Sequence, residues 1–143
     1  MKIAVLAICV ALSQTQRPAG PPPTEVFLAP LTVEGGSLKV GSPQNISNSP
    51  GYDNQPTFTP DGRALLFTSA RGEVSSKCGS PQTDIYRFEL QGRTLTRVTE
   101  TGDCEYSPTV TPDGRHISVI QVEPDGTQRL WPVSYTHLRA HET

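Results

Sequence analysis

Short apolar or alternating runs, separated by turn residues, follow one another from residue 24 to residue 133. They are four to eight residues long and rich in Val, Ile, Phe, Tyr and Thr, which β-strands favour. Beyond the first twelve residues, no segment keeps a helical period over about eleven positions. The pattern therefore predicts an all-β chain. The expected strands are residues 24–31, 38–40 continuing toward 45–47, 56–59, 64–69, 84–90, 94–99, 108–111, 116–121 and 128–133.

The run at residues 64–67 has four consecutive apolar residues, Ala-Leu-Leu-Phe, instead of an alternating pattern. A strand of this kind has no polar face to turn toward water. We therefore expect other elements to cover both of its faces.

A nine-residue pattern occurs twice, as QPTFTPDGR at residues 55–63 and SPTVTPDGR at residues 107–115, with seven identical positions. Self-similarity at a fixed spacing, here 52 residues, marks a repeat architecture. The complete repeat holds four strands, A to D, at residues 56–99. Strands C and D of an earlier repeat precede it, and strands A to C of another follow it.

Each copy of the pattern contains the turn Pro-Asp-Gly, at residues 60–62 and 112–114, and a third such turn lies at 124–126. Proline presets the φ angle of a turn, aspartate tolerates the bend, and glycine accepts a positive φ. We expect these turns to close the A–B hairpins of both repeats and the B–C hairpin of the second.

The segments QPTFTPDGRALLFTS, TDIYRFEL, LTRVT and YSPTVTPDGR resemble the WD-like β-propeller repeats of TolB-type periplasmic proteins. This resemblance covers residues 24–133 and implies a fragment of a β-propeller with four-stranded antiparallel blades, of which about two and a quarter are present. It also implies a non-catalytic binding or scaffold protein of the cell envelope, which recognises a protein or small ligand at its blade rims. The alternative is the propeller of a prolyl-oligopeptidase-type serine peptidase, with a catalytic domain outside this sequence.

The repeat of 52 residues exceeds the roughly 40–45 residues of a WD-type blade. Alignment of the two repeats places seven extra residues in the B–C loop, residues 72–82, which carries Cys78. Because turns of a meander alternate between two rims, this loop and the D–A loop with Cys104 are expected on the same rim. We predict a disulfide between Cys78 and Cys104, which would stabilise the fold by roughly 3–4 kcal/mol. Two free thiols are the alternative, and too few further ligands accompany them for a zinc site.

The first residues have the pattern of an export signal. Lys2 precedes a ten-residue apolar run at residues 3–12, which is too short to span a bilayer. We expect residues 1–13 to be a signal peptide and residues 14–23 a Pro-rich linker, so that the mature chain has no membrane span and is periplasmic or secreted. A disordered N-terminus of a cytosolic protein and a lipid-modified Cys9 are the alternatives.

The composition narrows the possible partners. The formal net charge is −2, and no run of basic residues is present, so no nucleic-acid partner is expected. The resemblance to TolB-type repeats implies envelope proteins or a small ligand as partners, and nothing in the sequence calls for a cofactor or a metal.

Two acidic residues, each followed by a polar or aromatic residue, precede the predicted A strands. They are Asp53-Asn54 and Glu105-Tyr106, in equivalent places of the two repeats. Because strand A is the innermost strand of a propeller blade, these residues could form a ligand or cation site at the mouth of a central channel. The simpler interpretation is that they are solvated loop residues at the strand ends.

The sequence provides no candidate for nucleophilic catalysis. It lacks a G-x-S-x-G motif, and His116 corresponds to Ala64 in the other repeat, which favours a surface position. His137 and His141 have the i, i+4 spacing of helical metal ligands but lie in the C-terminal segment. That segment, residues 134–143, has no strand or turn pattern and resembles an adaptor-derived ending. We expect it to be non-native, with strand D of the last repeat missing.

Overall fold

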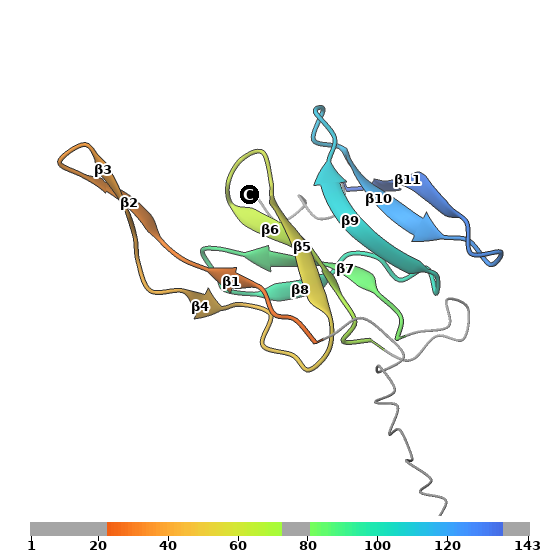
Figure 1. Ribbon diagram of the computed structural model, residues 1–143. Helices are drawn as coiled ribbons and strands as arrows, with labels where there is room; N and C mark the ends of the chain where they lie inside the picture. Colours follow the sequence, from red (N-terminus) through yellow and green to blue (C-terminus); the bar gives the residue numbers. More distant parts are fainter. Residues whose placement is uncertain (1–22, 73–80, 136–143) are drawn as a thin grey trace, which may run out of the picture.

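The computed structural model describes residues 23–72 and 81–135, and every regular element in these ranges is a β-strand (Figure 1). This confirms the all-β prediction. The signal segment, most of the linker, Cys78, His137 and His141 lie outside the described residues. No helix in the described ranges is long and apolar enough to cross a membrane. The strands are β1 (Phe27–Leu28), β2 (Leu31–Glu34), β3 (Ser37–Val40), β4 (Gln44–Asn45), β5 (Asp53–Phe58), β6 (Ala64–Ser69), β7 (Asp84–Glu89), β8 (Leu95–Arg97), β9 (Cys104–Val110), β10 (His116–Val122) and β11 (Gln128–Ser134).

Four consecutive strands form one antiparallel sheet in the order β5-β6-β7-β8, which is the complete four-stranded repeat. The following strands form a three-stranded sheet, β11-β10-β9, with the same path along the chain. Before them, β1 pairs with β4 as the two outer strands of an earlier repeat. A separate hairpin, β2–β3, extends away from the rest of the molecule (Figure 1).

Strands β5 and β9, the first strands of their sheets, begin at Asp53 and Cys104, three and four residues before the predicted starts at 56 and 108. The cause is a bulge in each strand, where the register shifts against the neighbouring strand. Gln55 and Ser107, the residues before the prolines, have φ angles of 56° and 55°, a left-handed conformation that is uncommon for non-glycine residues. Proline therefore marks a bulge within the strand, whereas the sequence suggested the strand's beginning.

The repeated Thr-Pro-Asp-Gly-Arg segment forms the predicted A–B turns. In the first repeat, the hydroxyl of Thr59 donates to Asp61, and Asp61 Oδ1 accepts the backbone N–H of Arg63 at 3.1 Å. Gly62 has a φ of 67°, as the turn requires. The second repeat has the same contacts between Thr111, Asp113 and Arg115. The identical residues thus form an identical turn network.

Strand β6 is buried along its whole length, as its continuous apolar run predicted. Leu65 and Phe67 face the β1–β4 pair, and Leu66 faces the three-stranded sheet. The side chains around them form two clusters, Val26, Ile46 and Phe88 on the first side and Ile85, Ile117, Val119 and Tyr135 on the second. One sheet therefore lies between two neighbours, which is how successive repeats share a hydrophobic core.

The single strand predicted at residues 24–31 is wrong. The chain forms β1, breaks at Pro30, and continues into β2 of the projecting hairpin. Proline has no N–H for the strand ladder, and the Pro30 carbonyl instead accepts the N–H of Gly41 at 2.8 Å. At the other end, β11 reaches Ser134 and Tyr135 is 2% exposed, so two residues past position 133 join the packed structure.

Candidate functional site

Two seams join the sheets, and the predicted acidic residues lie in them. Seam 1 is the junction between the β1–β4 pair and the four-stranded sheet, and seam 2 is the junction between the four-stranded and three-stranded sheets. In seam 1, the N–H of Asp53 donates to the carbonyl of Thr24 at 3.0 Å. In seam 2, the N–H of Glu105 donates to the carbonyl of Thr83 at 2.8 Å. The two acids therefore hold equivalent positions.

A hydroxyl at the end of the outer strand supports each seam. Ser47 Oγ accepts the N–H of Val26, and Thr99 Oγ1 accepts the N–H of Ile85, both at 2.9 Å. Backbone N–H groups buried at these positions need an acceptor, and Ser or Thr supplies one where the ladder ends. The two seams thus have equivalent backbone hydrogen bonds and differ in their side chains.

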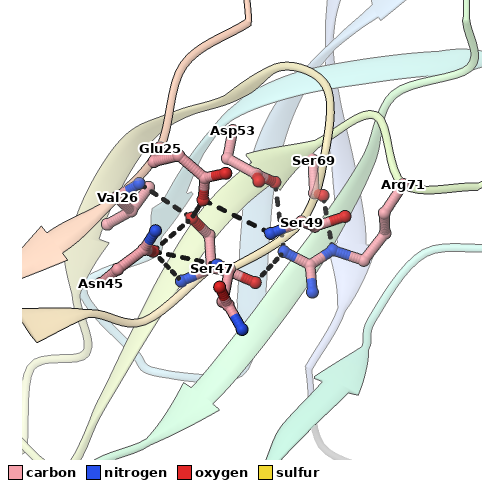
Figure 2. A network of polar contacts seen from close by, with 9 residues as sticks. Glu25, Val26, Asn45, Ser47, Ser49, Asp53, Ser69 and Arg71 are labelled. Atoms are coloured by element: carbon pink, nitrogen blue, oxygen red, sulfur yellow. Dashed lines mark hydrogen bonds and ion pairs between the residues drawn. The ribbon is translucent and has the colours of Figure 1, made fainter.

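In seam 1, Arg71 neutralises Asp53 (Figure 2). Its Nη2 lies 3.2 Å from Asp53 Oδ1 and 3.0 Å from the carbonyl oxygen of Ser47, and its Nε donates to Ser69 Oγ at 2.7 Å. The side chain of Asp53 is 1% exposed and that of Arg71 is 16% exposed. A carboxylate buried so deeply needs a cation or hydrogen-bond donors, and the guanidinium supplies both.

Two aromatic rings also lie close to the Arg71 guanidinium. The Arg71 guanidinium carbon lies 4.9 Å from the ring centre of Tyr86 and 5.6 Å from that of Phe67. Cation–π contacts of this kind add roughly 0.5–2 kcal/mol, depending on how far the cation is desolvated. Arg71 is therefore fixed by hydrogen bonds, charge and ring contacts together.

The outer margin of seam 1 carries a second carboxylate, Glu25, which accepts the hydroxyl of Ser47 (Figure 2). This hydrogen bond, with help from Asn45 and the N–H of Ser49, holds the pKa of Glu25 below its usual range. Asn45 Oδ1 in turn accepts the N–H of Asn48 at 2.9 Å. The polar groups of seam 1 are thus connected from the surface to the buried Asp53.

In seam 2, no cation of the described residues pairs with the buried acid. Glu105 is 1% exposed, and its Oε1 accepts the hydroxyl of Thr101 at 2.7 Å. Among the described residues, Oε2 has no hydrogen-bond partner. Burial raises the pKa of the Glu105 carboxyl above its usual range, the hydroxyls of Thr99 and Thr101 offset part of this rise, and the nearby carboxylates of Asp84 and Asp103 add to it.

The cation of seam 2 is bound to a different acid. Arg97 Nη2 lies 2.8 Å from Asp84 Oδ2, and the side-chain amide of Gln82 donates to Asp84 Oδ1 at 3.2 Å. Asp84 is fully buried. Arg97 therefore balances Asp84, while Glu105 keeps one oxygen without a donor.

Seam 2 also has a polar link between β5 and β9. Gln55 Oε1 accepts the hydroxyl of Thr68 at 3.0 Å and the N–H of Ser107 at 3.1 Å. The bulge at Ser107 frees that N–H from the strand ladder, and Gln55 of the neighbouring bulge satisfies it. The side chain of Gln55 at the bulge in β5 thus satisfies a backbone group at the bulge in β9.

No family model matches the chain, but its sequence is similar to that of several curated proteins of one name. The Tol-Pal system protein TolB of Bordetella pertussis is 42% identical over 62 residues, which make up 43% of this chain and 11% of that protein. The protein of the same name from Francisella tularensis subsp. mediasiatica is 29% identical over 100 residues, or 63% of this chain and 22% of that protein. This chain is a distant relative of TolB.

Solved TolB structures share the fold of this TolB-like chain. The crystal structure of TolB from Acinetobacter baumannii superposes with a TM-score of 0.56 at 20% identity, covering 77% of this chain and 27% of that one. The structure of putative TolB from Agrobacterium tumefaciens gives 0.55 at 16% identity, covering 82% and 47%. The sheets described here thus match part of TolB, and the chain spans less than a quarter of the length of the two curated relatives named above.

In the TolB-like chain, the predicted site residues lie within strands, because β5 and β9 start earlier than expected. Asp53 and Glu105 are buried, and Asn54 and Tyr106 are half-buried. Burial raises the pKa of the Tyr106 hydroxyl. Asp53 and Glu105 occupy different seams, each with its own partners. Their role in binding a ligand therefore remains a prediction.

Sequence reasoning missed the two arginines that balance the buried acids. Arg71 and Arg97 stand alone in their segments, and no motif singles them out. The available signal was indirect: a buried carboxylate needs a cation, and Arg71 follows strand B, which runs beside the strand of Asp53.

A cavity of about 560 Å³ lies where both arginines reach the rim, and it is lined by Arg71, Gly72, Gln82, Arg97, Glu100 and Gly102.

Within residues 23–72 and 81–135, no three His, Cys, Asp or Glu side chains gather as a group able to hold a metal. His116 is at the surface, with its Nδ1 3.8 Å from Asp113 Oδ2. Cys104 is 4% exposed at the start of β9, and its predicted disulfide with Cys78 remains a prediction.

Proposed function

We propose that this chain forms part of a β-propeller of the bacterial cell envelope and serves recognition without catalysis. The relationship to TolB carries this proposal, because it is found both in sequence, over 43% and 63% of this chain, and in the fold of solved structures. The relatives are Tol-Pal system proteins by name. A partner from a Tol-Pal system, in the periplasm, is therefore the first candidate for this chain.

The rim with the cavity of about 560 Å³ is the proposed contact surface. Buried Asp53 and Asp84 hold Arg71 and Arg97 in place there, at 3.2 Å and 2.8 Å. Preorganised side chains lose little freedom when a partner binds, which favours affinity. In this proposal Asp53 and Glu105 shape the rim from inside the seams, and Asn54 and Tyr106 lie on the inner strands beside it.

No observation favours the alternative of a peptidase propeller. The named relatives and solved structures are TolB proteins, which supports the binding role.

Isothermal titration calorimetry of the full chain against the purified proteins of a Tol-Pal system tests the proposal. We expect saturable binding to at least one of them. Glu100→Lys, at the exposed edge of the cavity, should weaken binding about tenfold or more, as reversal of a contacting charge does. Gln91→Lys, which introduces the same residue on the exposed β7–β8 turn, is the control and should leave the affinity unchanged. Absence of binding to all of them, or an equal effect of both variants, would contradict the proposal.

A further inference from the structure

The β2–β3 hairpin, residues Leu31–Val40 and called the arm below, is an insertion in one repeat. In the first repeat, Phe27 of the third strand pairs with Asn45 of the fourth, 18 residues later. In the complete repeat, the equivalent Tyr86 pairs with Arg97, 11 residues later. The first connection is therefore seven residues longer, and the additional length forms the arm (Figure 1).

The arm is a well-formed hairpin. Four cross-strand pairs run in register from Leu31↔Val40 to Glu34↔Ser37. Gly35 and Gly36 make the tight turn with φ angles of 58° and 79°, which L side chains rarely adopt. At its base, Gly41 approaches Pro30 so closely that a Cβ would lie 2.6 Å from the proline ring. The sequence thus specifies the hairpin at both ends.

One face of the arm is entirely apolar and lies in solvent. The pairs Leu31↔Val40 and Val33↔Leu38 share that face, since residues alternate along a strand. These four side chains are 62–73% exposed, and Phe27, at the foot of the arm, is 59% exposed. Together they are five of the nine large apolar side chains that are exposed among the described residues.

The other face of the arm is polar and electrically balanced. Lys39 and Glu34 form an ion pair there, and Thr32 and Ser37 complete the face. A two-stranded hairpin with a bare apolar face is marginally stable in water, and such faces usually mark an interaction surface. The arm therefore needs a partner that covers four aliphatic side chains and brings no charge.

We propose that the partner is a second copy of this chain, with the two arms packed face to face about a two-fold axis. The face is self-complementary, because it is aliphatic throughout and no charged residue lies on it, so two copies can meet without burying a charge. Each aliphatic side chain contributes roughly 60–120 Å². The eight side chains of two arms then bury about 500–1,000 Å². That area is in the range of weak, reversible complexes, which bury less than about 1,200 Å².

Sedimentation velocity of the full chain from about 1 µM to about 200 µM tests the proposal, since a weak dimer dissociates within this range. We expect a reversible monomer–dimer equilibrium. Leu38→Lys should weaken it at least about tenfold, because each dimer would bury two lysines in an apolar face. Leu130→Lys is the matched control, since Leu130 is 72% and Leu38 69% exposed, but Leu130 lies on the outer strand β11. It should leave the equilibrium unchanged.

Val33→Thr serves as a second variant that keeps the strand preference and side-chain shape of the arm. It should weaken the dimer by a smaller factor without changing the thermal unfolding midpoint. A chain that stays monomeric over the whole range, as it would if the arm served another protein, would overturn the proposal. So would a dimer that responds to Leu130→Lys but not to Leu38→Lys, or equally to both.

Discussion

Seams 1 and 2 have the same backbone hydrogen bonds but opposite solutions for a buried acid. In seam 1, Asp53 faces Arg71 at 3.2 Å, and the pair is further held by Ser47 and Ser69. In seam 2, one oxygen of Glu105 accepts a threonine hydroxyl, and no cation pairs with this carboxylate among the described residues. One oxygen of each acid, Asp53 Oδ2 and Glu105 Oε2, has no hydrogen-bond partner in the described part of the chain, so the seams differ in the cation. Equivalent positions of a repeat therefore need not have equivalent electrostatics.

The difference follows from the loop between the second and third strands of each repeat. Ser69 pairs with Asp53, and Gln121 pairs with Glu105, so Glu123 is the counterpart of Arg71. Fourteen residues separate β6 from β7, whereas five separate β10 from β11.

In the short loop, Glu123 belongs to a tight turn, where its N–H donates to the carbonyl of Thr127. Its carboxylate accepts the indole N–H of Trp131 at 3.1 Å. Glu123 carries the same charge as Glu105 and cannot neutralise it. Within the tight turn, its carboxylate is instead bound to Trp131. The longer loop of the first repeat leaves Arg71 able to turn into seam 1.

The largest effect is expected from removing the cation of seam 1. Arg71→Met keeps an aliphatic stem beside Tyr86 but leaves the carboxylate of Asp53 buried and uncompensated. The free energy of unfolding should fall by about 3–5 kcal/mol, the usual cost of breaking a buried ion pair by removing one partner. Urea denaturation followed by circular dichroism measures this change.

Two further variants separate the charge effect from lost packing. Arg71→Met with Asp53→Asn removes both charges and should recover at least about 2 kcal/mol relative to Arg71→Met alone. Arg129→Met, which breaks an exposed pair with Glu123 at 3.9 Å, should cost less than about 1 kcal/mol. If the double variant recovers nothing, Arg71 acts through packing and the charge comparison between the seams fails.

Removing the charge of Glu105 in seam 2 should raise the free energy of unfolding, whereas removing Arg71 from seam 1 should lower it. The pKa of Glu105 is raised in the folded state, so the folded protein holds this proton more tightly than the unfolded chain does. The stability from this proton is fully present below the unfolded pKa of about 4.3 and is lost as the pH rises through the folded pKa. Glu105→Gln does not titrate and should therefore be more stable than the original chain at pH 7, by about 1–3 kcal/mol.

The pH dependence makes this prediction specific. Below about pH 4, where Glu105 is protonated in both states, the advantage of Glu105→Gln should largely disappear. Glu100→Gln, at an exposed position on the same rim, should show no such pH-dependent gain. A Glu105→Gln variant that is less stable than the original chain at pH 7 would show that the carboxylate has a partner that the seam needs.

The repeat pattern in the sequence was sufficient to predict the sheets but not the seams. The continuous apolar run of β6 and the Pro-Asp-Gly turns led to correct strands because burial and turn geometry are local properties. The bulges at Gln55 and Ser107 were missed, since a left-handed glutamine or serine has no local signature. Arg71 was missed because its meeting with Asp53 depends on loop length and on packing between sheets, which become visible only when the elements are assembled.

The smallest expected effect concerns the polar link of seam 2. Gln55→Ala removes the acceptor shared by the hydroxyl of Thr68 and the N–H of Ser107, at 3.0 Å and 3.1 Å. The backbone at position 55 keeps its left-handed conformation in both proteins, so the loss of stability should reflect the hydrogen bonds, at about 1–2 kcal/mol. Gln91→Ala, at an exposed turn, is the matched control and should change stability by less than about 0.5 kcal/mol.

Hydrogen exchange at the Ser107 amide should accelerate in Gln55→Ala by more than its global stability change predicts, because that amide loses an acceptor. If exchange there rises only as much as elsewhere, the bulge is held by Thr68 alone, which also lies 3.2 Å from the Ser107 N–H nitrogen.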